Sequence, residues 1–181
     1  MPLPHVSRSA VPGAPSWGAQ QSRTVTWRDP VATQSAAASM SGLAYWQAVA
    51  DGQLPAPPMA ELLRTSVVAV EQGRITFCCS PDASMYNPLG MVHGGTVCTL
   101  LDTAAACALH TTLPLGVGYT SVEIKVNYLK PVTVDSGPLT AVGSVVKAGS
   151  RIGFAEGEVT DAAGKLIATA STTLLISELP R

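Results

Sequence analysis

An apolar run from residue 94 to about residue 111 constrains this chain more than any other feature. It carries one carboxylate, Asp102, and no other charged side chain. A helix that is hydrophobic on every side has to be buried on every side. Asp is a poor residue for a helix interior and is rarely buried without a partner. The run therefore predicts a central, enclosed helix whose carboxylate is either satisfied locally or used in chemistry.

The segments on both sides of this run alternate with the period of two that is typical of strands. Before it, Thr65–Glu71 and Arg74–Cys79 flank Gln72-Gly73, the signature of a β-hairpin. After it, four strands are expected over residues 119–129, 139–148, 152–161 and 166–176. Because the turns between the last three are short, these strands should form an antiparallel meander.

Two strands, a buried helix and four strands predict an α+β fold. A modest antiparallel sheet can cover a helix that is apolar on all sides only by curling around it. One six-stranded sheet cannot enclose the helix completely. We therefore expect a second subunit to close the gap.

The N-terminal part differs in composition, and we expect two regions, a disordered tail over residues 1–39 and one domain over residues 40–181. The tail is rich in Ser, Ala and Pro and shows no sustained periodicity. It is either a dispensable tail, a transit peptide or the product of a start site set before Met40. The domain should open with a short helix over residues 42–50, capped by Ser41, and one helical turn over residues 59–63.

Composition excludes several classes of protein. With 181 residues, 46% of them hydrophobic, the chain is long enough for one domain with a real core. A net charge of -1 gives no basic field for nucleic acid, and no stretch approaches the roughly 20 apolar residues needed to span a bilayer. The four cysteines fit neither a zinc site nor a secreted disulfide framework. We expect reduced thiols, a cytoplasmic protein and no metal.

Three consecutive motifs resemble one known family. They are Asn-Pro-x-Gly-x-Val-His-Gly-Gly from Asn87, Thr-Leu-Leu-Asp-Thr-Ala around Asp102, and the strand that begins Tyr-Thr-Ser-Val-Glu at Tyr119. Together they resemble the hotdog-fold acyl-CoA thioesterases of the phenylacetate-degradation, or PaaI-like, type. The resemblance implies a long helix in a curved six-stranded antiparallel sheet. It also implies a homodimer joined along residues 119–129, pairing of dimers into a homotetramer, and an active site built from both chains without metal or redox cofactor.

The helix start and its carboxylate are the first candidate catalytic groups. Gly94 and Gly95 begin the helix, where backbone N–H groups lack intrahelical partners and the dipole is positive. The resemblance implies that the Gly94 N–H stabilises the oxyanion and that Asp102 is the catalytic nucleophile or general base. The alternatives are glycines that only allow a tight turn and an Asp that only caps a neighbouring loop.

Three further side chains complete the expected catalytic group. The resemblance implies that Asn87 contacts the thioester or positions water, although Asn before Pro is also an ordinary turn residue. His93 either holds the substrate carbonyl or locks the loop through a backbone bond. A strand hydroxyl should position the attacking water, and we prefer Ser121 to its neighbour Thr120, since a one-residue slip would exchange them.

The phosphates of coenzyme A need cationic side chains or free N–H groups near the mouth of the site. The best candidates share one hairpin turn, with Lys125 and Lys130 behind them: Lys147, Gly149, Ser150 and Arg151. Charged residues at a turn are otherwise simply solvated. Gly95 and Thr120 are expected on the substrate side of the site.

The leading hypothesis is therefore an acyl-CoA thioesterase, which converts acyl-CoA and water to a free acid and coenzyme A. A non-catalytic acyl-CoA-binding module and a hydratase or dehydratase of the same fold are the alternatives. The acyl group is open between aryl-acetyl, hydroxylated aryl and medium-chain groups. We expect its pocket near Met91, Leu101, Leu113, Val117 and the strand that faces the helix.

Overall fold

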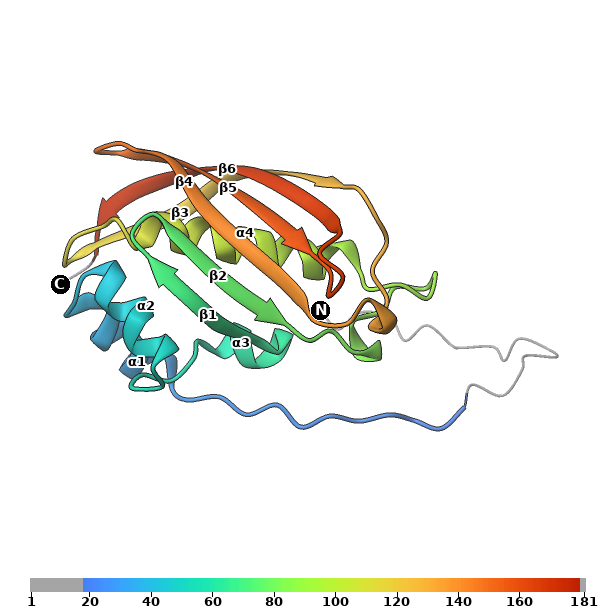
Figure 1. Cartoon of the computed structure of the whole chain (residues 1–181). Coiled ribbons are helices and arrows are strands. Elements are labelled where there is room, and N and C mark those ends of the chain that lie inside the picture. The colour runs from blue at the N-terminus through green and yellow to red at the C-terminus, as the bar shows by residue number, and fades with distance from the viewer. Residues whose placement is uncertain (1–17, 180–181) are drawn as a thin grey trace, which may run out of the picture.

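The computed structural model describes residues 18–179 and shows a curved sheet wrapped around one long helix (Figure 1). In chain order the elements are α1 (Pro30–Ala38), α2 (Gly42–Ala50), α3 (Pro58–Leu63), β1 (Thr65–Glu71), β2 (Arg74–Cys79), η1 (Ala83–Met85), α4 (Gly94–His110), β3 (Val117–Tyr128), η2 (Val134–Ser136), β4 (Leu139–Ala148), β5 (Ile152–Thr160) and β6 (Leu166–Glu178). The predicted hotdog fold is confirmed.

All six strands form one antiparallel sheet in the order β1-β2-β4-β5-β6-β3. The predicted hairpin at Gln72-Gly73 and the predicted meander of β4, β5 and β6 are both present. Strands β1 and β3, which lie far apart in this order, form the two edges. One face of the sheet packs on α4, and its inward positions carry the apolar residues that the alternation predicted.

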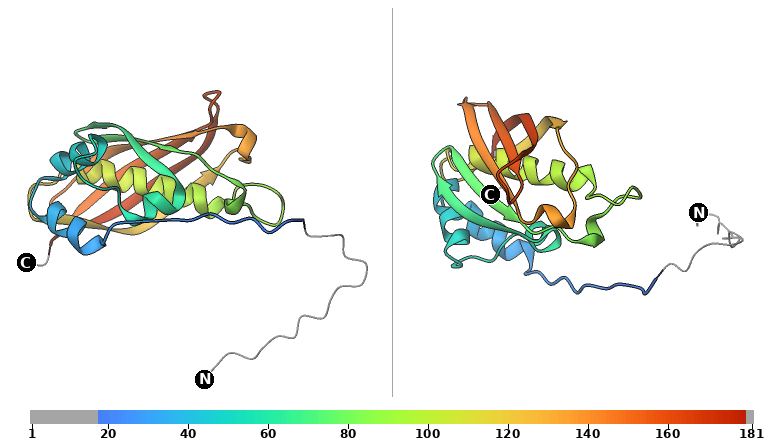
Figure 2. Two further views of the ribbon diagram at one scale, coloured as in Figure 1. Left: turned by 90° about the horizontal axis from the view of Figure 1, so that it is seen from below. Right: turned by 45° about the vertical axis from the view of Figure 1, so that its right-hand side comes forward.

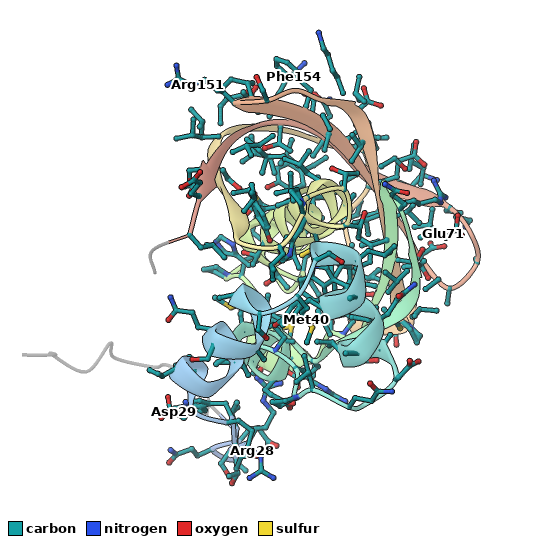
Figure 3. The ribbon with its side chains drawn as sticks, turned by 90° about the vertical axis from the view of Figure 1, so that its left-hand side faces the viewer. Arg28, Asp29, Met40, Glu71, Arg151 and Phe154 are labelled. Carbon is teal, nitrogen blue, oxygen red and sulfur yellow. The ribbon has the colours of Figure 1, made fainter. Side chains whose placement is uncertain are left out.

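Helix α4 lies in the hollow of the sheet, as Figure 3 shows from the side where its axis is seen nearly end-on. Every residue of its last two turns, Ala104 to His110, is buried. Helix and sheet approach so closely that a Cβ added at Gly143 on β4 would lie 1.9 Å from the Ala104 carbonyl oxygen. Only glycine fits there, because the obstacle is backbone and cannot turn aside.

The N-terminal helices cover the side of α4 that the sheet leaves open (Figures 2 and 3). Ser41 caps α2 as predicted, accepting the Ala44 N–H at 3.3 Å. Its first residue, Gly42, donates its N–H to the Leu113 carbonyl at 3.1 Å, which fastens α2 to the end of α4. The chain itself therefore closes part of the gap that we expected a second subunit to fill.

The predicted disorder of residues 1–39 needs a correction within this region. The structure places α1 over Pro30–Ala38, capped by the Asp29 carboxylate on the Val31 N–H at 2.9 Å. Its small apolar residues carry little periodicity, which is why sequence patterns gave no sign of it. The prediction for residues 1–17 lies outside the described residues, and the boundary between tail and domain stays a prediction.

Across residues 18–179, no helix combines the length and the apolar character needed to cross a membrane.

Candidate active site

The loop that precedes α4 is organised by the side chain of Asn87. Its Oδ1 accepts the N–H of Leu89 at 2.9 Å and that of Met91 at 3.3 Å. Because both partners are N–H donors, the atom that they contact is the amide oxygen. The other amide atom is therefore the nitrogen Nδ2. Nδ2 has no acceptor among residues 18–179. The turn role of Asn87 is thus confirmed, and its amide nitrogen is still available to donate to a bound carbonyl.

His93 is the N-cap of α4. Its side-chain Nδ1 accepts the Gly95 N–H at 2.8 Å, and the backbone N–H of His93 donates to the Met85 carbonyl at 2.8 Å. An imidazole that accepts at Nδ1 carries its proton on Nε2, which faces outward as a donor. Of the two predicted roles, the locking of the loop is therefore present in the structure, and it occupies the Gly95 N–H.

The first residue of α4 keeps its N–H free. No acceptor for the Gly94 N–H lies within the described part of the chain, and the positive end of the helix dipole adds to its pull on a negative charge. Tyr128 holds the other side of this peptide, donating its hydroxyl to the Gly94 carbonyl at 3.0 Å. A Cβ at Gly94 would lie 3.3 Å from the Tyr128 ring, so glycine keeps this approach open.

Asp102 is half-buried on α4 and has a specific partner. Ser121 on β3 donates its hydroxyl to Asp102 Oδ1 at 2.8 Å. This bond occupies Oδ1 and leaves Oδ2 available to a bound substrate or water. The predicted preference for Ser121 over Thr120 therefore agrees with the geometry, whereas the catalytic role of either residue stays a prediction.

Neighbours of Asp102 on the inner side are neutral. Burial, chiefly, and the nearby Asp102 charge raise the pKa of the Cys107 thiol to about 12. Burial also raises the pKa of the Tyr119 phenol, whose hydroxyl lies 3.7 Å from the Cys107 sulfur. Both groups stay protonated at neutral pH, so neither of them adds a charge at this end of the site.

A β-bulge in β3 allows Ser121 and Tyr128, which differ in parity, both to face the helix. The pairing of β3 with β6 shifts register between Ser121 and Glu123, which leaves Val122 as an extra residue. Before the bulge Tyr119 and Ser121 face α4, and after it the even-numbered residues do, including Tyr128. Bulges are common next to active sites because they redirect a side chain. A regular strand was predicted here, and periodicity alone carries no signal for the interruption.

One chain holds the expected catalytic groups in two separate places. Gly94 and Asp102 are eight residues apart on α4, which corresponds to about 12 Å along the helix axis. Asn87, Gly94 and Tyr128 line one cavity of about 270 Å³, whereas Asp102 and Ser121 line another of about 590 Å³. A single thioester carbonyl cannot reach both groups within one chain.

The larger cavity includes one of the predicted walls of the acyl pocket, the strand that faces the helix, but not the four predicted side chains. Its walls are α4, the N-terminal helices and strands β1, β2 and β3, and none of Met91, Leu101, Leu113 and Val117 lines it. Leu101 instead faces the sheet, where it would meet a Cβ at Gly157. The space between Leu101 and the sheet is closely packed, whereas Met91 lines the smaller cavity, and the position of the acyl group stays a prediction.

The turn proposed for coenzyme A lies far from Gly94 in the same chain. Gly149 donates its N–H to the Ile152 carbonyl at 3.0 Å, and Arg151 is seen at the end of the sheet in Figure 3. The adjoining Gly153 packs on Leu109, fifteen residues or about 22 Å along α4 from Gly94. Lys147 and Ser150 are exposed and line neither cavity. Thr120 is exposed and does not line the larger cavity, although its neighbours Tyr119 and Ser121 do.

Comparison with known proteins agrees with this architecture. The profile of the thioesterase superfamily matches residues 89–168, which include α4, β3, β4 and β5. A protein named as a thioesterase and as related to phenylacetic acid degradation, from Ralstonia eutropha, superposes with a TM-score of 0.66 and 26% identity. The match covers 72% of this chain and 98% of that one.

Three relatives are similar in sequence. Proteins named as esterases are 41% identical over 69 residues in Halobacterium salinarum and 30% identical over 110 residues in Saccharolobus solfataricus. Acyl-coenzyme A thioesterase 13 of Mus musculus is 32% identical over 83 residues. These matches cover 37%, 61% and 45% of this chain, and they span 44%, 76% and 58% of the relatives' own lengths. The chain belongs to the thioesterase superfamily.

Proposed function

We propose that this protein is an acyl-CoA thioesterase of the PaaI-like type that hydrolyses an acyl- or aryl-acyl-CoA. One observation carries the proposal: the Asp102 carboxylate, held by Ser121 at 2.8 Å, borders a largely apolar cavity of about 590 Å³. A carboxylate beside an apolar pocket suits attack on the carbonyl of a bound acyl group. The name of the mouse relative supports acyl-CoA as the substrate.

The reaction follows from the available atoms. Asp102 Oδ2 either attacks the thioester carbonyl, forming an anhydride that water then hydrolyses, or takes a proton from the attacking water. The developing oxyanion accepts the Gly94 N–H at the helix start, and Asn87 Nδ2 donates to the same carbonyl region. The C–S bond breaks, and the thiolate of coenzyme A leaves and is protonated. The products are a free acid and coenzyme A.

A homodimer resolves the separation between the two halves of the site. Strand β3 is an edge of twelve residues whose middle, from Thr120 to Glu123, is exposed. Long exposed edges readily pair with another strand. A two-fold axis across β3 makes the two α4 helices antiparallel, so Gly94 and Asn87 of one chain approach Asp102 of the other. The homotetramer, the coenzyme A role of the turn at Gly149 and the cytoplasmic location stay predictions.

The activity is tested by release of free thiol from a panel that contains acetyl-, hexanoyl- and phenylacetyl-CoA. We expect turnover by the wild type and little by Asp102→Asn. Tight binding of these compounds without thiol release would favour the binding-module alternative and contradict the proposal. A single turnover in oxygen-18-labelled water then tests the nucleophilic role, because label in Asp102 with an unlabelled product acid would show that water attacked the aspartyl carbonyl of an anhydride.

A complementation experiment tests the shared site. Asn87→Ala and Asp102→Asn, each weakly active alone, are unfolded together and refolded as a mixture. If each site uses both chains, half of the dimers are mixed and hold one intact site, so about a quarter of wild-type activity should return. If no activity returns, each site lies within one chain. The two variants refolded separately and then mixed serve as the control.

A further inference from the structure

The larger cavity follows one face of α4. Asp102, Ala106 and His110 are spaced four residues apart, which places them on one side of the helix, and all three line the cavity. From Asp102 to His110 this face extends about 12 Å. A group that starts at the carboxylate can therefore extend along two helical turns before it reaches His110.

Helix α2 lines the cavity beside His110. Trp46 on α2 donates its Nε1–H to His110 Nδ1 at 3.0 Å, and only 5% of this tryptophan is exposed. Its ring meets those of Tyr45 and Phe77 edge-on, with centroids 5.1 and 5.7 Å away. An indole held by a hydrogen bond and two aromatic contacts is a rigid end wall.

No cationic side chain among the described residues lines this cavity. Its charged lining residues are both acidic, Asp102 and Glu61. Burial lowers the pKa of His110 to about 4, so its imidazole is neutral at pH 7. Burial raises the pKa values of Tyr45 and Tyr119, which keeps both phenols protonated. A carboxylate that entered the far end would find no positive charge there.

We infer that the acyl group occupies this cavity, that it is an uncharged acyl group, and that Trp46 sets its maximum length. The inference rests on the proposed function, because Asp102 must act at the thioester carbonyl that forms the near end of the group. The coenzyme A part of the substrate is too polar for these walls, so it extends out of the cavity through the open side. The N-terminal helices, which lie outside the matched superfamily region, thus determine substrate choice.

The charge selection is tested with hexanoyl-CoA and adipoyl-CoA, which share six carbons and differ by one terminal carboxylate. Burial of an unpaired carboxylate is costly, so we expect the wild type to prefer hexanoyl-CoA by about a hundredfold or more in kcat/KM. Equal kcat/KM values for the two compounds would overturn this part of the inference.

The length selection is tested with a series of straight-chain acyl-CoAs and two opposite variants. Trp46→Ala opens the end wall and should move the optimum to longer chains, whereas Ala106→Leu fills the middle and should move it to shorter ones. Each methylene that no longer fits costs about tenfold. Trp27→Ala is the matched control, because Trp27 is 62% exposed and does not line the cavity.

The readout is the ratio of kcat/KM between long and short chains, which a merely destabilised enzyme would leave unchanged. Ala106→Leu keeps the test decisive if Trp46→Ala does not fold. If both variants hydrolyse acyl-CoAs with the wild-type ratio, the inference is wrong and the thioesterase proposal stands. If the wild type releases no thiol from any compound, the proposed function itself is wrong.

Discussion

The two halves of α4 are built from similar residues and have different surroundings. From Gly94 to Thr103 the helix keeps a free N–H, a capped start and a half-buried carboxylate along the open side of the fold. From Ala104 to His110 every residue is buried against the sheet or α2. The same apolar run therefore carries the candidate catalytic groups at one end and serves packing at the other. Mutations should separate activity from stability along one helix.

Asp102→Asn should have the largest effect on activity, since it removes the one carboxylate in the first half of α4 and keeps the shape of the side chain. Loss of a general base or nucleophile lowers kcat by about 10²–10⁴-fold. The amide can still accept the Ser121 hydroxyl, so the thermal midpoint should change little. Thiol release and thermal unfolding measure the two effects. Wild-type turnover in this variant would remove Asp102 from the mechanism.

Leu109→Ala tests the second half. Leu109 is 0% exposed and packs against β5 at Gly153, away from both cavities of the candidate site. Truncation of a buried leucine lowers the free energy of unfolding by about 2–5 kcal/mol. Urea denaturation measures this loss, and activity per folded molecule should be preserved. A large fall in kcat at full folding would show that the two halves are not separable.

His110 makes the second half sensitive to pH. Its pKa is about 4 in the folded protein and 6.5 ordinarily, so between these values the unfolded chain binds a proton that the folded chain does not. The contribution of neutral His110 to the free energy of unfolding is thus fully present above pH 6.5. It is lost as the pH falls toward 4, and the loss is on the order of 3 kcal/mol.

The matched variant is His110→Asn, whose side-chain oxygen can still accept the Trp46 Nε1–H and does not titrate. Urea denaturation of both proteins at pH 7 and pH 4.5 gives the comparison. The wild type should lose more stability than the variant over this range. Equal losses would mean that His110 is as accessible to protons in the folded state as in the unfolded one.

Ser121→Ala should have the smallest effect, in the first half again. It removes the hydroxyl that holds Asp102 Oδ1, and a hydrogen bond to a charged group is worth about 1.5–3 kcal/mol. We expect kcat/KM to fall at least about tenfold. Ser121→Thr should retain much of the activity, and Thr120→Ala should retain nearly all of it. A greater loss in Thr120→Ala would reverse the choice between the two hydroxyls.

Much of the fold was predictable because its signals are local. The hairpin at Gln72-Gly73, the Ser41 cap and the burial of α4 all follow from residues close together in sequence. Asp102 stood out for the same reason, as a lone carboxylate in an apolar helix. α1 was missed, since a run of small residues at Pro30–Ala38 has neither alternation nor an apolar stripe.

The sequence by itself determined the strands, the central helix and the carboxylate on it, because periodicity and turn chemistry act over a few residues. Only the tertiary structure decided that a bulge at Val122 brings Ser121 and Tyr128 to the same face of β3 and that Trp46 bonds His110 in the lining of one cavity. It also placed Gly94 and Asp102 in two different cavities of one chain. These features depend on which distant segments meet, and that is settled by the packing of the whole chain around α4.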